Sequence, residues 1–287
     1  MIVGGQESVM VAPVAIYGYG RFGSSLHSAL LRAGAEPVIG VREGATHSPA
    51  AGYATGAAGL LDSLRPGSLV LLCVPDGAIS DVARQFAQLP TAAGHAFAHV
   101  SGAHGSVELA PLAEAGALTG VFHILRSFPC ADLSGSYATV SGRDEVLPQL
   151  EELAGFLGLN CVRLPDESRT EYHAAAVLAC NALTTLLGEA IKLLRGIGVE
   201  ESDARAMLGP LVQGTLDNTL NKGPEQALTG PVVRGDAETV ERHLNALSSD
   251  TRELYVATMK ATLRLAERSG RLDAEAAGVL RALLGGD

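Results

Sequence analysis

The feature that most constrains this chain is a set of three glycines, Gly18, Gly20 and Gly23, directly after a short apolar run at 14–17. Helical periodicity follows, so the segment predicts a strand, a tight turn and the start of a helix. In such a G-x-G-x-x-G turn the first glycine permits the bend, the second lets the backbone approach a phosphate, and the third lets the helix pack on the strand. The helix N-terminus offers N–H groups to an anion.

We therefore expect a dinucleotide pyrophosphate at this turn, the alternative being a glycine-rich turn that binds nothing. The residues predicted to contact the cofactor here are Gly18, Tyr19, Gly20, Arg21, Phe22 and Gly23.

The residue after the second predicted strand, at 37–41, indicates which dinucleotide fits. NAD-binding proteins usually place an acidic residue about 20 positions beyond the glycines, where it accepts a hydrogen bond from the ribose 2′-hydroxyl. Arg42 occupies that place, and a guanidinium would instead pair with a 2′-phosphate. We therefore expect NADP. Glu43 would restore an NAD-like acid if the register moved by one residue, and the alternative for Arg42 is a solvated loop cation.

Composition excludes several classes of protein. With 287 residues, 47% of them hydrophobic and 18% charged, the chain is expected to be globular. Its net charge of −10 argues against nucleic acid or an anionic membrane as the main partner. We find no basic N-terminal region followed by a long apolar stretch and no uninterrupted apolar run of about 18 residues. We therefore expect no signal peptide, no membrane span and a cytoplasmic location. The four widely spaced cysteines predict buried reduced thiols and no metal site: Cys73, Cys130, Cys161 and Cys180.

The pattern along the chain divides near Pro165. Up to a last strand at 161–164, short apolar strands alternate with helices, which predicts an α/β fold with a doubly wound, Rossmann-type parallel sheet in residues 1–165. From there on only helical signals occur, so residues 166–287 are predicted to form an all-α domain. Its first helix, at 171–194, is apolar over much of its circumference, as a helix buried on several sides would be. A substrate is expected in the cleft between the domains.

Residues at the predicted strand ends are the first candidates for cofactor contact and chemistry. The candidates beside the cofactor are Val74, Pro75, Asp76, Ser101 and Gly102. The Ser101 hydroxyl and the neighbouring N–H groups could hold a substrate carboxylate, while the alternative is that Ser101 only caps a turn.

Further candidates follow in the chain. His123 could donate to a carbonyl, although a histidine at a strand end is more often structural. On the long helix, His173 and Asn181 share one face, which fits either a polar cleft or a hydrogen bond to another helix. A loop at 228–236 carries Arg234, which could clamp a carboxylate. The candidates for substrate binding are Arg126, Ser127 and Arg234.

Six segments together resemble one family. They are GYGRFG at 18–23, VPD at 74–76, SGA at 101–103, HILRSF at 123–128, YHAAAVLACN at 172–181 and LTGPVVRGD at 228–236. The family combines a Rossmann-like domain with a C-terminal helical domain of unknown function. It is similar to pyrroline-5-carboxylate reductase, 3-hydroxyisobutyrate dehydrogenase and ketopantoate reductase, and some members resemble an alternative ketopantoate reductase class serving pantothenate synthesis.

The resemblance implies NADP-dependent reduction of a small carboxylate-bearing carbonyl or imine. It also implies a helical domain like the C-terminal domain of 6-phosphogluconate dehydrogenase and a homodimer joined through that domain. One departure is informative: the hydroxyacid dehydrogenases carry a catalytic lysine four residues before an asparagine, and here Val177 precedes Asn181. We therefore expect His123 or His173 to supply the proton, with Asn181 orienting the substrate.

The resulting prediction is an NADPH-dependent reductase, with ketopantoate as the first substrate to test. The alternatives are an imine reductase of the pyrroline-5-carboxylate type and a non-catalytic NADP-binding sensor or scaffold, which the missing lysine would favour.

Overall fold

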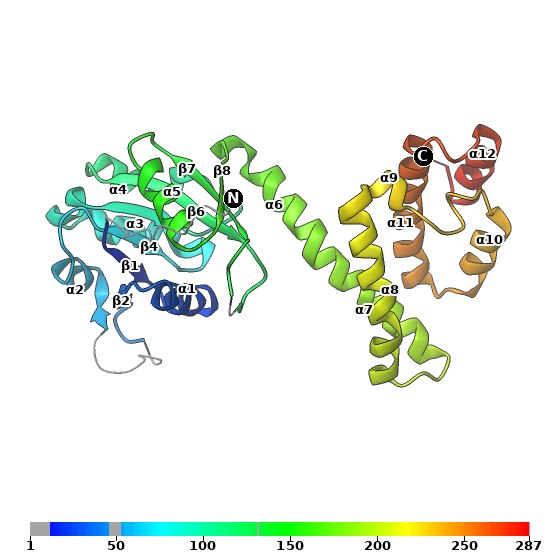
Figure 1. Cartoon of the computed structure of the whole chain (residues 1–287), viewed down its shortest axis with the longest axis horizontal. Coiled ribbons are helices and arrows are strands. Elements are labelled where there is room, and N and C mark those ends of the chain that lie inside the picture. Colours follow the sequence, from blue (N-terminus) through cyan, green and yellow to red (C-terminus); the bar gives the residue numbers. More distant parts are fainter. Residues whose placement is uncertain (1–11, 46–52, 131, 287) are drawn as a thin grey trace, which may run out of the picture. The chain divides into compact units, whose positions relative to one another are not determined.

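The computed structural model describes residues 12–45, 53–130 and 132–286, which pack as two compact units, one ending at Ala182 and one beginning at Leu183. Strands and helices alternate in the first unit, and the second consists of helices and loops (Figure 1). The predicted fold class, a Rossmann-type sheet followed by a helical region, is confirmed. The predicted domain boundary at 165/166 rests on the sequence pattern and stays a prediction.

The first unit contains an eight-stranded sheet in the order β3-β2-β1-β4-β5-β6-β7-β8. The strands are β1 Val14–Tyr17, β2 Val38–Val41, β3 Ala54–Thr55, β4 Leu69–Leu72, β5 Ala96–His99, β6 Leu118–Leu125, β7 Tyr137–Gly142 and β8 Asn160–Arg163. Neighbouring strands are parallel except β6 and β7, which pair antiparallel. The expected parallel sheet therefore holds from β3 to β6, and β7 and β8 run the opposite way. The carboxyl ends of β1, β2, β4, β5 and β6 consequently lie along one edge.

Helices cover both faces of this sheet. They are α1 Arg21–Arg32, α2 Gly56–Asp62, α3 Ile79–Ala87, α4 Ala110–Glu114 and α5 Leu147–Phe156. Because strand side chains alternate, Val14 and Ile16 pack with α1 and α5, whereas Ala15 and Tyr17 pack with α2, α3 and α4. Burial on both faces explains why the strands read as continuous apolar runs.

Short turns and the first part of a long helix complete the first unit. The 3₁₀ turns are η1 Asp76–Ala78, η2 Pro90–Gly94, η3 Ser106–Leu109 and η4 Asp166–Ser168. The long helix begins with α6 Arg169–Val177, passes through the π-helical turn η5 Leu178–Ala182 and continues as α7 Leu183–Gly196. It corresponds to the helix predicted at 171–194.

The second unit consists of α7 and five further helices. These are α8 Glu201–Lys222, α9 Pro224–Ala227, α10 Ala237–Ala246, α11 Ser249–Arg268 and α12 Ala274–Leu283. The short α9 was not predicted. Val240 and Leu244 of α10 pack with Leu263 of α11 and Leu280 of α12 to form the core of this unit.

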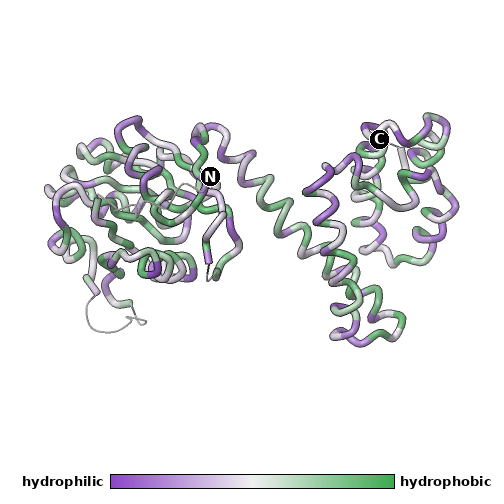
Figure 2. Tube along the Cα trace, viewed as in Figure 1, coloured by the Kyte–Doolittle hydropathy of each residue, from purple (hydrophilic) through white to green (hydrophobic). Residues whose placement is uncertain are grey.

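The expected burial of the long helix is wrong for the single chain. No residue of α7 is buried, and in α8 the sole buried residue is Ala204. Hydrophobic residues nevertheless run along α6 and α7 (Figure 2). Averaged over a window, the hydropathy of Asp166–Gly196 reaches 1.6, so by length and composition alone this helix could cross a membrane. A helix that packs against another subunit has the same properties, so this is weak support for a membrane span.

The prediction of buried cysteines is also wrong in part. None of the four cysteines forms a disulfide, and Cys73 is buried, but Cys161 and Cys180 are exposed. Cys161 lies on β8 at the edge of the sheet, and Cys180 lies on the uncovered long helix. Apolar neighbours in the sequence do not bury a side chain when its element is left uncovered.

Candidate functional site

The glycine turn after β1 has the geometry that a dinucleotide cradle requires. Gly18 has φ +106°, and a Cβ there would lie 2.4 Å from the Cys73 carbonyl oxygen. A Cβ on Gly23 would lie 2.2 Å from the Gly18 carbonyl oxygen, so α1 packs against the turn only without a side chain. At Gly20, by contrast, a Cβ would meet no described atom within 4 Å. The turn is thus closely packed around Gly18 and Gly23 and open above Gly20.

The N-terminus of α1 faces this open position and has neither an acidic residue in its first turn nor a capping side chain, since the N-cap residue is Gly20. The free N–H groups and the positive end of the helix dipole would therefore favour an anion. Of the flanking candidates, Tyr19 bonds to His27 Nδ1 at 2.8 Å and Phe22 packs on Phe128, while Arg21 is exposed.

Arg42 follows the last residue of β2 and is exposed at the same edge of the sheet. Among the described residues none forms an ion pair with its guanidinium. Glu43 is turned towards α2, where its Oε1 would lie 3.1 Å from a Cβ on Gly56. At the carboxyl end of β2, the arginine is therefore free to meet an anion while the glutamate faces the neighbouring helix.

The loop after β5 holds a set of imidazole hydrogen bonds. His99 Nδ1 accepts from the Ser101 N–H at 3.2 Å, and His99 Nε2 lies 2.9 Å from the Gly105 carbonyl oxygen. These partners define a neutral imidazole with its proton on Nε2, and burial lowers the pKa of His99. Ser101 Oγ accepts from the Ala103 N–H at 3.3 Å and lies 3.0 Å from His104 Nδ1. The turn-capping interpretation of Ser101 therefore has direct support, and its role at the catalytic site, holding a substrate carboxylate, stays a prediction.

Asp76 lies beside this loop from the end of β4. Its Oδ2 is 3.4 Å from His104 Nδ1, the same nitrogen that contacts Ser101 Oγ. The three groups therefore do not form a serine-hydrolase triad, in which aspartate and serine contact opposite nitrogens of the histidine. The nearby candidates Val74 and Pro75 flank the turn, half-buried and exposed respectively.

Five of the predicted residues line one cavity of about 600 Å³ within the first unit. They are His123, Arg126, Ser127, His173 and Asn181. Tyr172 supplies a further polar group, and most of the remaining lining is apolar side chains of α6 and η5, including Val177. Asn181 lines the cavity although it lies in the π-helical turn, where strict α-helical spacing does not hold. The volume and mixed lining suit a small organic molecule.

His123 and Tyr172 form a hydrogen-bonded pair at this cavity. His123 Nδ1 lies 2.8 Å from the Tyr172 hydroxyl, with the two rings nearly perpendicular. Burial, followed by the positive charge of Arg169, lowers the pKa of His123 to about 4, so the imidazole is neutral at physiological pH. Burial raises the pKa of Tyr172, while Arg169 acts in the opposite direction.

Gly102 brings the β5 loop against the same histidine. A Cβ on Gly102 would lie 2.9, 3.0 and 3.1 Å from Nε2, Cε1 and Cδ2 of His123. Similar distances to three ring atoms place Gly102 over the face of the imidazole. A glycine is therefore needed here for packing, and the in-plane direction from Nε2 is left open.

A buried charged network holds the start of α6 above the sheet. The Arg169 side chain, 1% exposed, donates from Nε and Nη2 to Ser141 Oγ on β7 at 3.0 and 2.7 Å. Asp166 lies 3.6 Å from Arg169 Nε and accepts from the Ser106 N–H and hydroxyl at 2.7 and 2.6 Å. Its other oxygen accepts from the Ser141 hydroxyl. Helix α6, which carries Tyr172, is thus anchored to β7 and to the loop after β5.

The predicted carboxylate clamps differ in position. Arg126 lines the cavity, but it also donates to Cys130 Sγ at 3.3 Å and to Ser136 Oγ at 3.4 Å. Arg234 lies in the second unit, 3.9 Å from Asp236, and its role stays a prediction. Asp236 accepts from the Thr239 N–H at 3.1 Å and is the N-cap of α10.

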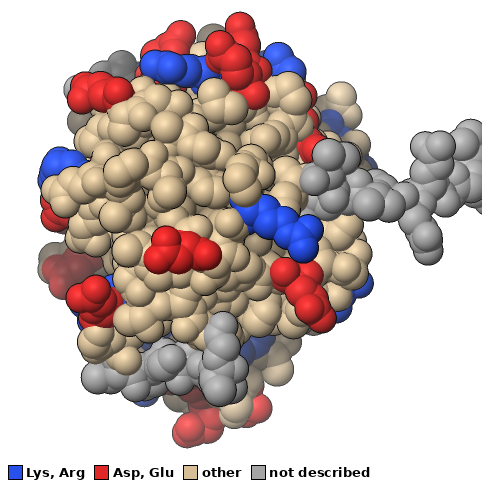
Figure 3. Space-filling view, turned by 90° about the vertical axis from the view of Figure 1, so that its left-hand side faces the viewer, with Lys and Arg blue, Asp and Glu red and all other residues tan. Residues whose placement is uncertain are grey.

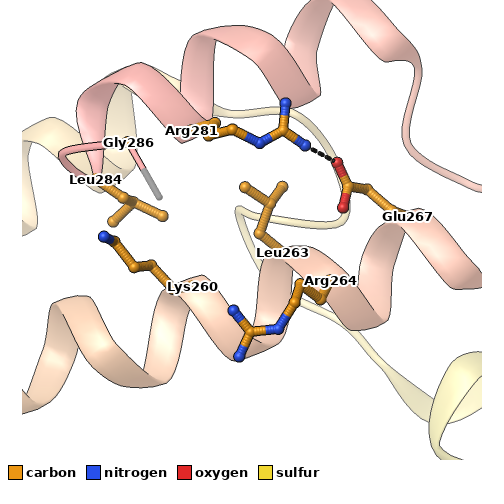
Figure 4. A pocket seen from close by; sticks show the side chains of 7 residues that line it. All are labelled: Lys260, Leu263, Arg264, Glu267, Arg281, Leu284 and Gly286. Carbon is orange, nitrogen blue, oxygen red and sulfur yellow. Dashed lines mark hydrogen bonds and ion pairs between the residues drawn. The ribbon is translucent and has the colours of Figure 1, made fainter.

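A second cavity, of about 220 Å³, lies between α11 and α12 (Figure 4). Lys260, Arg264 and Arg281 line it, but Arg281 is paired with Glu267, and none of the predicted site residues is present. On the face shown in Figure 3, charged side chains of both signs are scattered among the described residues rather than gathered into one patch. Among the residues that the structure describes, no group of three or more His, Cys, Asp or Glu side chains could hold a metal ion.

Comparison with family models agrees with this geometry. A Rossmann-like domain matches residues 8–124, and a domain of unknown function, DUF2520, matches residues 136–262. The chain joins a Rossmann-like domain to a DUF2520 domain. Since the DUF2520 match begins at 136, it includes β7, β8 and the anchored start of α6 as well as helices of the second unit.

Solved structures share the fold of this Rossmann–DUF2520 chain at low sequence identity. A protein from Bacteroides fragilis is 22% identical over 87% of this chain and 97% of its own, with a TM-score of 0.69. Pyrroline carboxylate reductase from Plasmodium falciparum, solved with NADP bound, is 10% identical over 96% and 99%, with a TM-score of 0.60. A reductive aminase from Aspergillus terreus, solved with NADPH, is 18% identical over 95% and 92%, with a TM-score of 0.60. Among curated proteins, none matches the sequence.

Three residues of the site were missed by sequence reasoning. Tyr172 was part of a recognised motif but received no role, and Arg169 and His104 were not considered. A signal for Tyr172 was present, since it is adjacent to His173 in an otherwise apolar helix. Arg169 offered none, because an arginine near a helix start is usually exposed.

Proposed function

We propose that this protein is an NADPH-dependent reductase of a small carboxylate-bearing carbonyl compound, with 2-dehydropantoate (ketopantoate) as the first candidate. The observation that carries the proposal is the open position above Gly20, with the uncapped N-terminus of α1 behind it. At the same sheet edge lies the exposed Arg42, which has no ion-pair partner in the described part of the chain. The shared fold of two reductases solved with NADP or NADPH supports the choice of cofactor.

The residues present fit the cofactor and divide its binding among them. The α1 N–H groups would hold the pyrophosphate, and Arg42 would pair with the 2′-phosphate. When bound, NADPH supplies the hydride that reduces the carbonyl carbon. His123 or His173 donates to the carbonyl oxygen, Asn181 orients the substrate, and Arg126 or Arg234 pairs with its carboxylate.

Two alternatives remain under this proposal. The reductive aminase and pyrroline carboxylate reductase folds favour an imine as substrate, which would use the same cavity. A non-catalytic NADP sensor is favoured by Val177 at the position where the related dehydrogenases carry lysine.

The test is to titrate the full chain with NADPH and with NADH by fluorescence, then to follow NADPH oxidation with 2-dehydropantoate and 1-pyrroline-5-carboxylate. Oxidation with either substrate supports a reductase and identifies its class. Tight NADPH binding without turnover on a wider panel of 2-oxo acids and cyclic imines would favour the sensor. Absence of binding to both nucleotides would refute the enzyme and the sensor together.

Arg42→Ala should remove the preference for NADPH. Loss of a charge-assisted pair with the 2′-phosphate should weaken NADPH binding by about tenfold to 100-fold. NADH affinity should stay nearly constant, because NADH lacks that phosphate. Arg65→Ala is the matched control. Arg65 is also exposed, but it precedes β4 and so lies at the amino ends of the parallel strands, away from the proposed cofactor site. Equal losses for both nucleotides would contradict the assignment.

We further propose that the protein is a cytoplasmic homodimer joined through its helical domain. Support comes from large apolar side chains left uncovered on α8: Met207 is 59%, Leu211 66% and Leu220 83% exposed. Exposed apolar surface of this extent is typical of a subunit interface.

Leu211→Asp should convert the dimer into a monomer. Met207 and Leu211 are four residues apart on one face of α8, so an aspartate there would place a charge in an apolar interface. The expected result in light scattering is half the wild-type mass. Val107→Asp, at a 73% exposed apolar position in the first unit, should leave the mass unchanged. A monomeric wild type would contradict the proposal directly.

A further inference from the structure

We propose that Tyr172 and His123 form a proton relay in which His123 Nε2 donates to the substrate oxygen while Nδ1 takes the proton of the Tyr172 hydroxyl. The inference rests on the proposed reductase function and goes beyond it, because it makes Tyr172 the source of the proton. It also favours His123 over His173 as the group that meets the substrate.

The first argument is the tautomer of His123. Its Nδ1 lies 2.8 Å from the Tyr172 hydroxyl, and among the described residues Nε2 has no hydrogen-bond partner. If Tyr172 donates to Nδ1, the imidazole proton lies on Nε2. Gly102 covers the face of the ring and leaves the in-plane Nε2–H direction free, and His123 lines the cavity. The donor atom is thus available to a substrate in that cavity.

The second argument is that the histidine cannot act alone. A pKa of about 4 leaves it neutral near pH 7, and a neutral imidazole is a very weak acid. Donation from Nε2 becomes feasible when Nδ1 gains a proton in the same step, because the ring then stays neutral. Tyr172 is the hydrogen-bond partner placed at Nδ1 to supply that proton.

The third argument is the buried cation behind the pair. Arg169 is almost fully buried, and its Nη1 has no hydrogen-bond partner among the described residues. Its charge adds to the lowering of the His123 pKa that burial causes, and at Tyr172 it opposes the rise in pKa that burial causes. The positive charge of Arg169 therefore disfavours an imidazolium at His123 and favours a tyrosinate at Tyr172. The relay needs this distribution of charge.

The step balances as follows. As the carbonyl carbon gains the hydride that bound NADPH would supply, the C=O π electrons would move to oxygen, and His123 would donate its Nε2 proton to that oxygen to complete the alcohol. The Tyr172 proton passes to Nδ1, leaving His123 neutral and Tyr172 as a phenolate near Arg169. Solvent then returns a proton to the phenolate, and the imidazole exchanges back to its starting tautomer.

One test needs no substrate. In the full chain with ¹⁵N-labelled histidine, the His123 resonances between about pH 6 and 8 should show a protonated Nε2 and an unprotonated Nδ1. The charged and titratable groups that act on this ring are Arg169, His173, Asp76 and His99. Tyr172→Phe should shift the tautomer balance. A His123 protonated on Nδ1, or titrating near its ordinary pKa, would overturn the relay.

The second test measures the protons that move. With 2-dehydropantoate, or with another 2-oxo acid of the panel if that is the one reduced, Tyr172→Phe should lower kcat about 100-fold and leave NADPH binding unchanged. The dependence of kcat on the D₂O fraction should be curved in the wild type, since two protons move, and linear in Tyr172→Phe. Tyr255→Phe is the matched control, because Tyr255 bonds to His243 Nδ1 at the same 2.8 Å in the second unit.

The outcomes separate the two proposals. NADPH binding without any turnover would count against the reductase, and the histidine resonances would still decide the state of the pair. Turnover that is unaffected by Tyr172→Phe would overturn the relay and leave the reductase intact.

Discussion

Gly20→Val should fold normally and lose NADPH. A Cβ at this position meets no described atom within 4 Å, and φ of −78° suits any residue, so the cost to folding should stay within about 1 kcal/mol. The valine would occupy the space into which the pyrophosphate must come to reach the α1 N–H groups. We expect NADPH affinity to fall at least about 100-fold, which is about 2.8 kcal/mol. Fluorescence titration and thermal unfolding measure the two effects separately.

Gly59→Val provides the control for this change. Gly59 lies on α2, and a Cβ there also meets no described atom within 4 Å. It should bind NADPH like the wild type. Normal binding by Gly20→Val would show that the glycine turn is not where the pyrophosphate lies.

The Rossmann-type half of the fold was predictable because its signals are local. The roles expected for Gly18 and Gly23 depend on contacts within the turn or with the adjacent β4 end, and both contacts are present. Strand directions beyond β6 were not predictable in this way. The antiparallel pairing of β7 depends on how the chain returns between strands, and no residue of the strand itself specifies it.

The candidate site was predictable where polar residue types stand out near the end of a strand or along one apolar helix. His123, His173 and Asn181 were chosen from the sequence, and all three line the same cavity. The hydrogen bonds were not predictable, because His123 and Tyr172 lie 49 residues apart in sequence. The burial of Arg169 likewise depends on Ser141, a partner on another element.

The wrong expectation for the long helix has a different cause. An apolar circumference predicts that a helix is covered, but it does not identify what covers it. In α7 and α8 the single chain supplies almost no cover, and the exposed Leu211 and Leu220 show the consequence. The sequence of a helix that another subunit would cover can therefore resemble that of a helix buried in a core.

The buried network at the start of α6 should have the largest effect on stability. Asp166→Asn keeps the shape of the side chain but removes the charge that faces the buried Arg169 and weakens its acceptance from two serines. Breaking a buried pair costs about 3 to 5 kcal/mol, and the one-third exposure of Asp166 reduces this to about 2 to 3 kcal/mol. Urea unfolding near pH 7 measures the change. Asp81→Asn, which breaks an exposed pair with Arg84, should cost less than about 1 kcal/mol.

Asp166→Asn should also change how the free energy of unfolding depends on pH, in a direction that the pKa of Asp166 determines. Burial alone would raise the pKa of Asp166, but hydrogen bonds from Ser106 and Ser141 and the charge of Arg169 hold it below its ordinary value. A depressed folded-state pKa contributes stability that is present above the unfolded value of about 3.9 and is lost as pH falls through the folded value. The stability curves of wild type and Asp166→Asn should therefore differ most above about pH 4 and converge in more acidic solution. A constant difference across that range would mean that Asp166 acts through its shape and not its charge.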